Sequence, residues 1–321
     1  MNVGQRVLMA LMLVVMTAAP VFAQRPSIPP QAITAPALDI VPVPFDEALI
    51  LPEGIELSSV AAVDIDAHGH VIVLHRGTQA LLEFEPDGDF VRAFGEGLFR
   101  RSHGLRIDDD GNYWTTDFST HLVMKLSPAG EVLVTLGTSG ERGTWDDAAG
   151  VHLFDEPNDV AFDSAGNVYV AQGHSRGDPQ VIKFDSELNF VTMWGGRGTL
   201  PGQFAVPHSI VIDEDDLIYV ADRENRRIQI FDTDGNFVKG WLYYGMACGL
   251  ELHGDRIYMT TGFDGQVAVI DKATGDVLGV AGMPGEGLGE YGEAHLLAVS
   301  DDGSVYVADA NQRRVQKYRA P

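Results

Sequence analysis

The sequence predicts an all-β fold, a six-bladed β-propeller closed by a strand from the N-terminal segment. One unit recurs six times: an apolar strand ending in acidic residues, a turn that often carries glycine, and a second strand, as in "GLRIDDDGNYWTTD" and "SIVIDEDDLIYVAD". Long helical periodicity is absent, and four short strands per unit are typical of propeller blades. A parallel β-helix is the weaker alternative because its repeats are shorter and more regular.

The six units follow one another from residue 55 onward. Their turns, 38 to 55 residues apart, fall at Gly69, Gly111, Gly166, Asp216, Gly254 and Gly303. Glycine and aspartate at these places permit tight reversals between paired strands. The last unit stops after "RVQKYRAP" without a fourth strand. We therefore expect residues 38–44 to supply that strand, so that the ring has no exposed edge.

The segments before the repeats predict export and a single folded domain. Residues 1–23 resemble a cleavable signal peptide, with Arg6 before an apolar run and "VFA" as the cleavage site. A membrane anchor is the weaker alternative, since the apolar run is shorter than the ~20 residues that a span needs. Residues 24–54 form a Pro-rich segment and residues 55–321 the propeller. We expect a periplasmic or secreted protein with no membrane span after signal cleavage.

The composition excludes some function classes. Lys and Arg number 22 against 46 Asp and Glu, a formal net charge of −24. Without a basic stripe, nucleic-acid binding is excluded. The single cysteine, Cys248, excludes an internal disulfide, so stability has to come from a large core. No oligomer interface can be read from the sequence.

Histidines occupy one position of the repeat in every second unit. At the start of the first strand, this column contains Ala61, His103, Asn158, His208, Cys248 and His295. The first strand of each blade lines the central channel, and alternate blades lie about 120° apart, so three imidazoles can converge on one axial point. Three neutral imidazoles with an open position form a catalytic metal site. The alternative is a ring of histidines that bind only water.

Three further residues are candidates for the same face of the ring. Arg76 and Arg223 each follow the second strand of a blade, where guanidinium groups can hold a carboxylate or an oxyanion. For both arginines the alternative is a structural ion pair with a nearby acid, of the kind that Glu224 can form with Arg226 or Arg227. His174 lies in the corresponding loop of the third blade. It can serve as a base or an extra ligand, or be a solvated loop residue.

At these residues the chain resembles a known family, the peptidyl-α-hydroxyglycine α-amidating lyases, which are NHL-repeat propellers. The matching stretches, in the family's order, are "HRG" (75–77), "SHGLRIDDDGNYWTTD" (102–117), "PGQFAVPHSI" (201–210), "YVADRENRRIQIF" (219–231) and "DDGSVYVADA" (301–310). The resemblance implies a divalent metal, with zinc the expected ion, bound by His103, His208 and His295. It implies two active-site arginines at Arg76 and Arg223, and cleavage of a peptidyl-α-hydroxyglycine to a peptide amide and glyoxylate.

The chain departs from the family's pattern in three places. His174 replaces the family's catalytic tyrosine. Glu293 and Leu296 stand where the family has a methionine and an aspartate around the last histidine, which weakens the case for a structural calcium ion. Tyr219 and Ile230 occupy the positions of one pair of disulfide cysteines. The metal cradle therefore carries over better than the reaction.

Three functions follow as hypotheses. The first is a metal-dependent carbon–nitrogen lyase in which His174 removes the substrate's hydroxyl proton while Arg76 and Arg223 hold its oxygens. An imidazole, with an unperturbed pKa near ~6.5, suits a base at neutral pH better than a phenol near ~10. The second is the same cradle acting on another hydroxy acid, amide or lactone. The third is a non-enzymatic scaffold that binds a partner, since fold alone does not imply activity.

Overall fold

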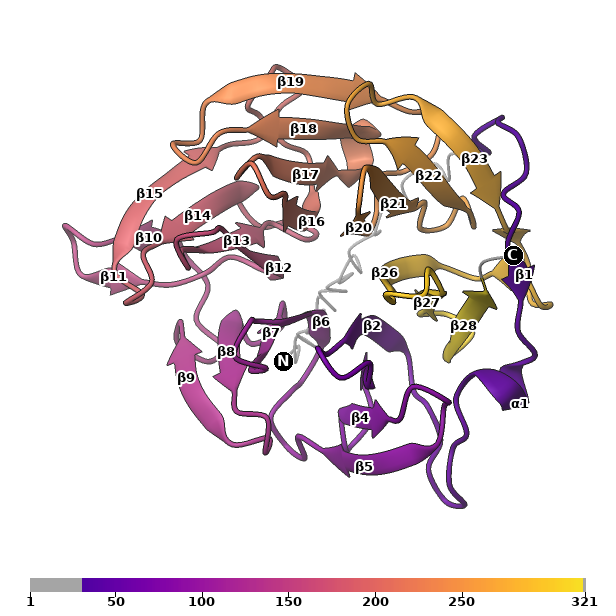
Figure 1. Cartoon of the computed structure of the whole chain (residues 1–321). Helices are drawn as coiled ribbons and strands as arrows, with labels where there is room; N and C mark the ends of the chain where they lie inside the picture. Colours follow the sequence, from indigo (N-terminus) through magenta and orange to yellow (C-terminus); the bar gives the residue numbers. More distant parts are fainter. Residues whose placement is uncertain (1–30, 320–321) are drawn as a thin grey trace, which may run out of the picture.

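A computed structural model describes residues 31–319, so the predicted signal peptide over residues 1–23 lies outside the described residues. The structure confirms the predicted propeller: six four-stranded antiparallel sheets surround a central channel (Figure 1). In blades one to three the strands, from channel to rim, are β2 (Val60–Ile65), β3 (Val71–His75), β4 (Leu81–Phe84) and β5 (Phe90–Phe94); β6 (Ser102–Ile107), β7 (Tyr113–Asp117), β8 (Leu122–Leu126) and β9 (Val132–Leu136); and β12 (Pro157–Phe162), β13 (Val168–Gln172), β14 (Gln180–Phe184) and β15 (Phe190–Gly195).

The other three blades repeat this pattern. Their strands are β16 (Pro207–Ile212), β17 (Ile218–Asp222), β18 (Arg227–Phe231) and β19 (Phe237–Leu242); β20 (Leu250–His253), β21 (Arg256–Thr260), β22 (Val267–Asp271) and β23 (Val277–Ala281); and β26 (Ala294–Val299), β27 (Val305–Asp309), β28 (Arg314–Arg319) and β1 (Val41–Pro42). Two short pairs lie in the loops between blades: β10 (Trp145–Asp146) with β11 (Val151–His152), and β24 (Met283–Pro284) with β25 (Glu290–Tyr291).

The N-terminal segment closes the ring as predicted. β1 pairs antiparallel with β28, Val41 opposite Arg319 and Pro42 opposite Tyr318. The closing strand is shorter than the predicted 38–44, because the chain first meets blade five, where the Leu38 N–H donates to the Val280 carbonyl at 2.9 Å. Helix is confined, within residues 31–319, to α1 (Phe45–Ala48) and a 3-10 turn, η1 (Arg223–Asn225). Neither described helix is long and apolar enough to cross a membrane.

In four of the six blades, an aspartate directly after the first strand builds the following turn. Asp108 Oδ1 accepts the backbone N–H groups of Asp110 at 3.1 Å and Asn112 at 2.9 Å. This side chain therefore replaces a backbone partner and fixes the reversal into the second strand. The equivalent aspartates of blades one, three and four are Asp66, Asp163 and Asp213.

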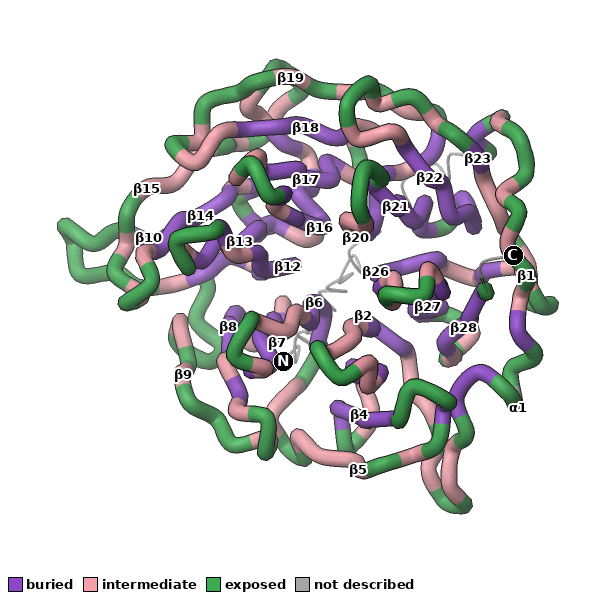
Figure 2. Tube along the Cα trace, viewed as in Figure 1, coloured by how far each residue is buried: buried purple, intermediate pink, exposed green. Residues whose placement is uncertain are grey.

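The apolar core lies between the blades rather than inside any one of them. Six clusters of buried side chains each combine residues of at least two neighbouring blades. Inner strands are buried and the outermost strands and rim loops are exposed (Figure 2). Because burial of apolar area is the dominant favourable contribution to folding, these six interfaces hold the inner strands in fixed positions around the channel.

Candidate metal centre in the propeller channel

The structure brings the three column histidines together. His103, His208 and His295 are each the second residue of an inner strand, on β6, β16 and β26. Their centroids lie 4.6 Å (103 to 208), 4.7 Å (103 to 295) and 4.9 Å (208 to 295) apart. The residues are 0%, 0% and 2% exposed. Three imidazoles from alternate blades thus meet in a site shielded from bulk water.

The intervening blades orient these rings. Each histidine hydrogen-bonds through Nδ1 to the backbone carbonyl of the column residue in the next blade. The three bonds join His103 to Asn158 (2.8 Å), His208 to Cys248 (3.0 Å) and His295 to Ala61 (2.5 Å). Since a carbonyl oxygen only accepts, each Nδ1 carries the proton and each Nε2 keeps a free lone pair. This is the tautomer that a metal ligand requires.

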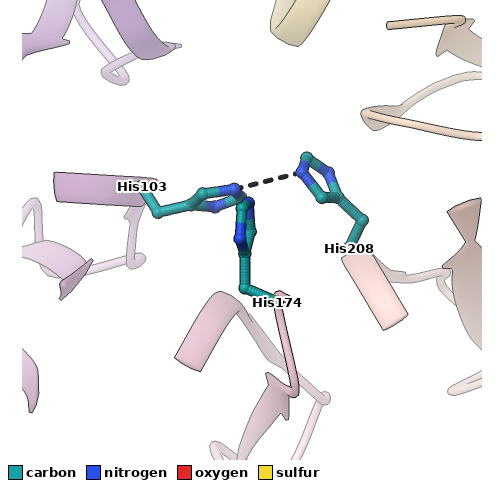
Figure 3. A group of neighbouring side chains, drawn as sticks. All are labelled: His103, His174 and His208. Atoms are coloured by element: carbon teal, nitrogen blue, oxygen red, sulfur yellow. Dashed lines mark hydrogen bonds between the residues drawn. The ribbon is translucent and has the colours of Figure 1, made fainter. Parts of the chain in front are cut away.

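The contact between two of these nitrogens fits a shared cation. Nε2 of His103 lies 3.1 Å from Nε2 of His208 (Figure 3). Two nitrogens that each coordinate zinc at about 2.0–2.1 Å in a tetrahedral site are roughly 3.3 Å apart. Two lone pairs at this separation need a positive charge between them. The donor set therefore fits a divalent ion that favours imidazole.

Burial keeps these rings neutral. Desolvation lowers the pKa of His103 and of His208 well below the usual range, and neighbouring charges and imidazoles lower it further. Burial, with the charge of Arg76, lowers the pKa of His295 to about 3. An extra proton is therefore a poor counter-charge for the facing lone pairs at neutral pH.

Buried aspartates fix the loops that lead into the histidine strands. Asp117 Oδ2 accepts the backbone N–H groups of Arg100 at 2.5 Å and Arg101 at 2.7 Å, just before His103. The equivalent aspartates of blades four and six, Asp222 and Asp309, accept backbone N–H groups in the loops before His208 and His295. Sequence reasoning missed this set, although each aspartate follows its histidine by the same 14 positions.

Arg76 and Arg223 lie beside the histidines. Arg76 donates from Nε to the Ser102 carbonyl at 3.1 Å and from Nη1 to Ser59 Oγ at 3.1 Å. Arg223 pairs with Glu224 at 3.3 Å, while its buried Nε has no hydrogen-bond partner. Part of each guanidinium is thus committed to the protein, and Arg223 retains a buried donor for a ligand.

His174 also points into the site. Nitrogens of His103, His174 and His208 all lie within 4.8 Å of one another, the one such group among the described residues that could hold a metal ion (Figure 3). The predicted ligand His295 is not part of this group, although its ring centroid lies 4.7 Å from that of His103. The ring centroid of His174 is 4.7 Å from that of His103. Burial, with the charge of Arg223, lowers the pKa of His174 well below its usual range. The loop residue is therefore a neutral imidazole at the centre.

Sequence reasoning assigned no role in the site to three further side chains. Phe118 stacks on His174 with a centroid separation of 4.4 Å and an interplanar angle of 14°. The Arg101 guanidinium lies over the ring of Phe118, 5.0 Å from its centroid. Glu293 is a half-buried carboxylate in the field of Arg76 and Arg223, and burial raises its pKa. Phe118 directly follows the second strand of its blade, as Arg76 and Arg223 do. Arg101 and Glu293 each lie two residues before a column histidine. The residue types differ at these positions, so the search for a repeated residue type did not select them.

A second polar layer lies three residues further along the inner strands. Arg106 donates to both carboxylate oxygens of Asp159 (3.1 and 2.8 Å), to Glu251 (2.7 Å) and to the Leu250 carbonyl (3.1 Å). Asp64, on blade one, accepts the Ile107 N–H at 2.8 Å. This network joins strands of several blades around the guanidinium of Arg106, whose side chain is 12% exposed.

The structure offers no carboxylate where the family's calcium ligand was considered. Leu296, directly after His295, packs with Ala62 and Leu105 in an apolar cluster between blades. A structural calcium ion therefore lacks its expected aspartate in this chain.

Comparisons with known proteins agree with this architecture. Residues 204–231 match the NHL repeat family model. NHL repeat-containing protein 3 of Homo sapiens is 30% identical over 80% of this chain and 78% of its own length. Peptidyl-alpha-hydroxyglycine alpha-amidating lyase 1 of Drosophila melanogaster is 26% identical over 82% of this chain and 57% of its own length. Peptidylglycine alpha-amidating monooxygenase of Rattus norvegicus is 29% identical over 81% of this chain.

The matched region is a part of the longer relatives. The chain spans 30% of the length of the rat protein. Among solved structures, a streptogramin B lyase superposes with a TM-score of 0.61 over 86% of this chain and 97% of its own, at 15% identity. At that identity the superposition shows a common fold and nothing of a common substrate.

Proposed function

Because the chain belongs to the family of NHL-repeat propellers that includes the peptidyl-α-hydroxyglycine α-amidating lyases, we propose that it is a metal-dependent carbon–nitrogen lyase. It cleaves a peptidyl-α-hydroxyglycine to a peptide amide and glyoxylate. The observation that supports the proposal is the close approach of the His103, His208 and His295 rings, whose centroids lie 4.6 to 4.9 Å apart. The names of the relatives supply the substrate class.

His103, His208 and His295 would hold one divalent ion, and zinc is the expected species. The carbonyls that accept their Nδ1 protons lock the rings in the metal-binding tautomer. When bound there, such an ion would supply Lewis acidity toward a substrate oxygen.

Arg76 and Arg223 orient the substrate. A charge-assisted hydrogen bond to a carboxylate contributes about 1.5–3 kcal/mol. The unpartnered Nε of Arg223 is a preorganised donor for such an oxygen. The two guanidiniums thus hold the carboxylate that leaves as part of glyoxylate.

His174 moves the proton. Its neutral imidazole accepts the proton of the substrate hydroxyl, the oxygen's electron pair forms the new carbonyl, and the C–N bond breaks with its electrons on nitrogen. The imidazole then returns that proton to the nitrogen, which completes the amide. Atoms balance without added water or an oxidant.

A specific observation favours a second candidate, the same cradle acting on a substrate without a carboxylate, such as a lactone. Glu293 lies in the field of both Arg76 and Arg223 and opposes their positive charge. A site in which this charge is already partly balanced discriminates less strongly in favour of an anionic substrate.

The test is an assay of the zinc-loaded protein with a short N-acyl-α-hydroxyglycine and, separately, with a series of lactones. We expect stoichiometric glyoxylate and amide from the first substrate. The matched control is His152→Ala, an exposed histidine on β11, which should retain full turnover. Lactone hydrolysis without glyoxylate release would favour the second candidate, and turnover of neither class by metal-loaded protein would contradict both.

A further inference from the structure

His174 lies where a fourth metal ligand would lie. A ring nitrogen of His174 lies within 4.8 Å of ring nitrogens of both His103 and His208. The three side chains point toward one another from separate elements (Figure 3). The ring centroid of His174 lies 5.6 Å from that of His208. A residue that acted only as a distant base would not need to approach both ligands so closely.

The surroundings of His174 hold the ring in this position. Phe118 stacks on one face, and Nδ1 lies 2.9 Å from Ser175 Oγ, which can accept its proton and leave Nε2 with a lone pair. The loop is anchored by Glu156, whose carboxylate accepts the backbone N–H groups of Ser175 at 2.6 Å and Arg176 at 3.0 Å. The imidazole is therefore preorganised toward the channel histidines.

We propose that His174 is a fourth, displaceable ligand of the metal, bound in the resting site and released when substrate enters. The inference rests on the proposed function for the metal itself. Four protein ligands are typical of closed sites, whereas a catalytic site keeps one position open. One of the four must leave for substrate to reach the ion.

His174 is the ligand that can leave. His103 and His208 are fully buried and start core strands, whereas His174 is on a loop and is partly exposed. Its Nε2 has one lone pair, which can either coordinate the metal or accept a proton. Displacement by substrate thus both opens the metal and frees the base, so the free base is present only when a substrate is bound.

Cobalt(II) binding tests the proposal without reference to turnover, because its visible absorption reports ligand number and geometry. We expect His174→Ala to bind Co²⁺ more weakly by at least the roughly 10–100-fold that the loss of a group supporting a ligand costs, and to show a changed spectrum. Ser175→Ala should shift the spectrum in the same direction by less. His152→Ala, matched in residue type, should reproduce the wild-type affinity and spectrum.

Adding ligand to the wild-type Co²⁺ protein tests displacement. A short N-acyl-α-hydroxyglycine should move the spectrum toward that of His174→Ala, and the N-acylglycine that lacks the hydroxyl should not. A spectrum unchanged by the hydroxylated ligand would show that His174 is not displaced.

The outcomes separate the two proposals. Unchanged Co²⁺ affinity and spectrum in His174→Ala overturn the fourth ligand and leave the lyase proposal standing. A changed spectrum without glyoxylate production keeps the ligand and overturns the lyase. Failure of the wild-type protein to bind Co²⁺ or Zn²⁺ overturns both.

Discussion

Two layers of the channel differ in where their positive charge comes from. In the layer of His103, His208 and His295, the imidazoles contribute lone pairs and no charge, and two Nε2 atoms face each other at 3.1 Å. In the second layer, Arg106 supplies its own cation to Asp159 and Glu251. The second layer is complete within the chain and serves stability. The histidine layer has facing lone pairs that a bound cation would neutralise, and the proposed function therefore places the reaction there.

The largest expected effect comes from breaking the histidine layer. His208→Ala removes one ligand and leaves the apolar clusters between blades unchanged. Since a bound metal contributes several kcal/mol to transition-state stabilisation, we expect turnover to fall about 10³-fold or more. Initial rates of glyoxylate release, with the far-UV circular dichroism spectrum as the check on folding, measure this. Turnover within a few-fold of wild type would place the reaction elsewhere.

Breaking the second layer should lower the stability of the protein and leave its metal binding intact. Arg106→Met leaves Asp159, which is 0% exposed, without its counter-charge. Removing one partner of a buried ion pair destabilises proteins by about 3–5 kcal/mol. Denaturant unfolding should show this loss, while Co²⁺ affinity of the folded protein stays close to wild type. The control is Arg256→Met, an exposed arginine; equal stability of both variants would refute the structural role of this layer.

A substitution at Arg223 tests whether this residue binds the substrate beside the histidine layer. Arg223→Lys keeps the charge and loses the planar donor set, including the unpartnered Nε. We expect kcat/KM for the N-acyl-α-hydroxyglycine to fall about 10–100-fold, the range that one charge-assisted hydrogen bond spans, with unchanged metal content. The exposed Arg256→Lys is the control, and unaltered kcat/KM in Arg223→Lys would remove this residue from the site.

The smallest effect concerns pH and the second layer. Burial, only partly offset by Arg106, raises the pKa of Glu251 to about 7, and burial raises the pKa of Asp64 to about 6. In the unfolded chain Glu251 loses its proton near pH 4.5, whereas in the folded protein it keeps the proton up to about pH 7. The stability that the protonated side chain contributes is therefore fully present below pH 4.5 and is lost as the pH rises to about 7.

A neutral isostere should therefore be more stable than the wild type at high pH. We expect the free energy of unfolding of Glu251→Gln to exceed that of the wild type by about 1–2 kcal/mol at pH 8 and to equal it at pH 4. Urea unfolding at both pH values measures this, with the exposed Glu53→Gln as control. A gain of equal size at both pH values would show that the effect is unrelated to ionisation.

The sequence predicted what the repeat makes periodic. Strand and turn lengths are similar from blade to blade. A position counted back from the turn therefore identified the channel residues His103, His208 and His295 from the sequence alone. The aspartates at 117, 222 and 309 obey the same periodicity, so counting forward from each histidine could have identified them as well.

What the sequence could not show depends on contacts that no period encodes. The stacking of Phe118 on His174 joins two loops of different blades, 56 positions apart (174 − 118). The bond from Arg106 to Glu251 crosses 145 positions. Both are set by how the blades pack around the axis, which fixes loop conformation and channel width together.

The most direct test of the central claim is the metal content of the full-length protein after equilibration with zinc and removal of the free ion. The account predicts about one zinc ion per chain, and none retained when His208 is replaced by alanine. Zinc-free wild-type protein, or equal zinc in both proteins, would contradict it.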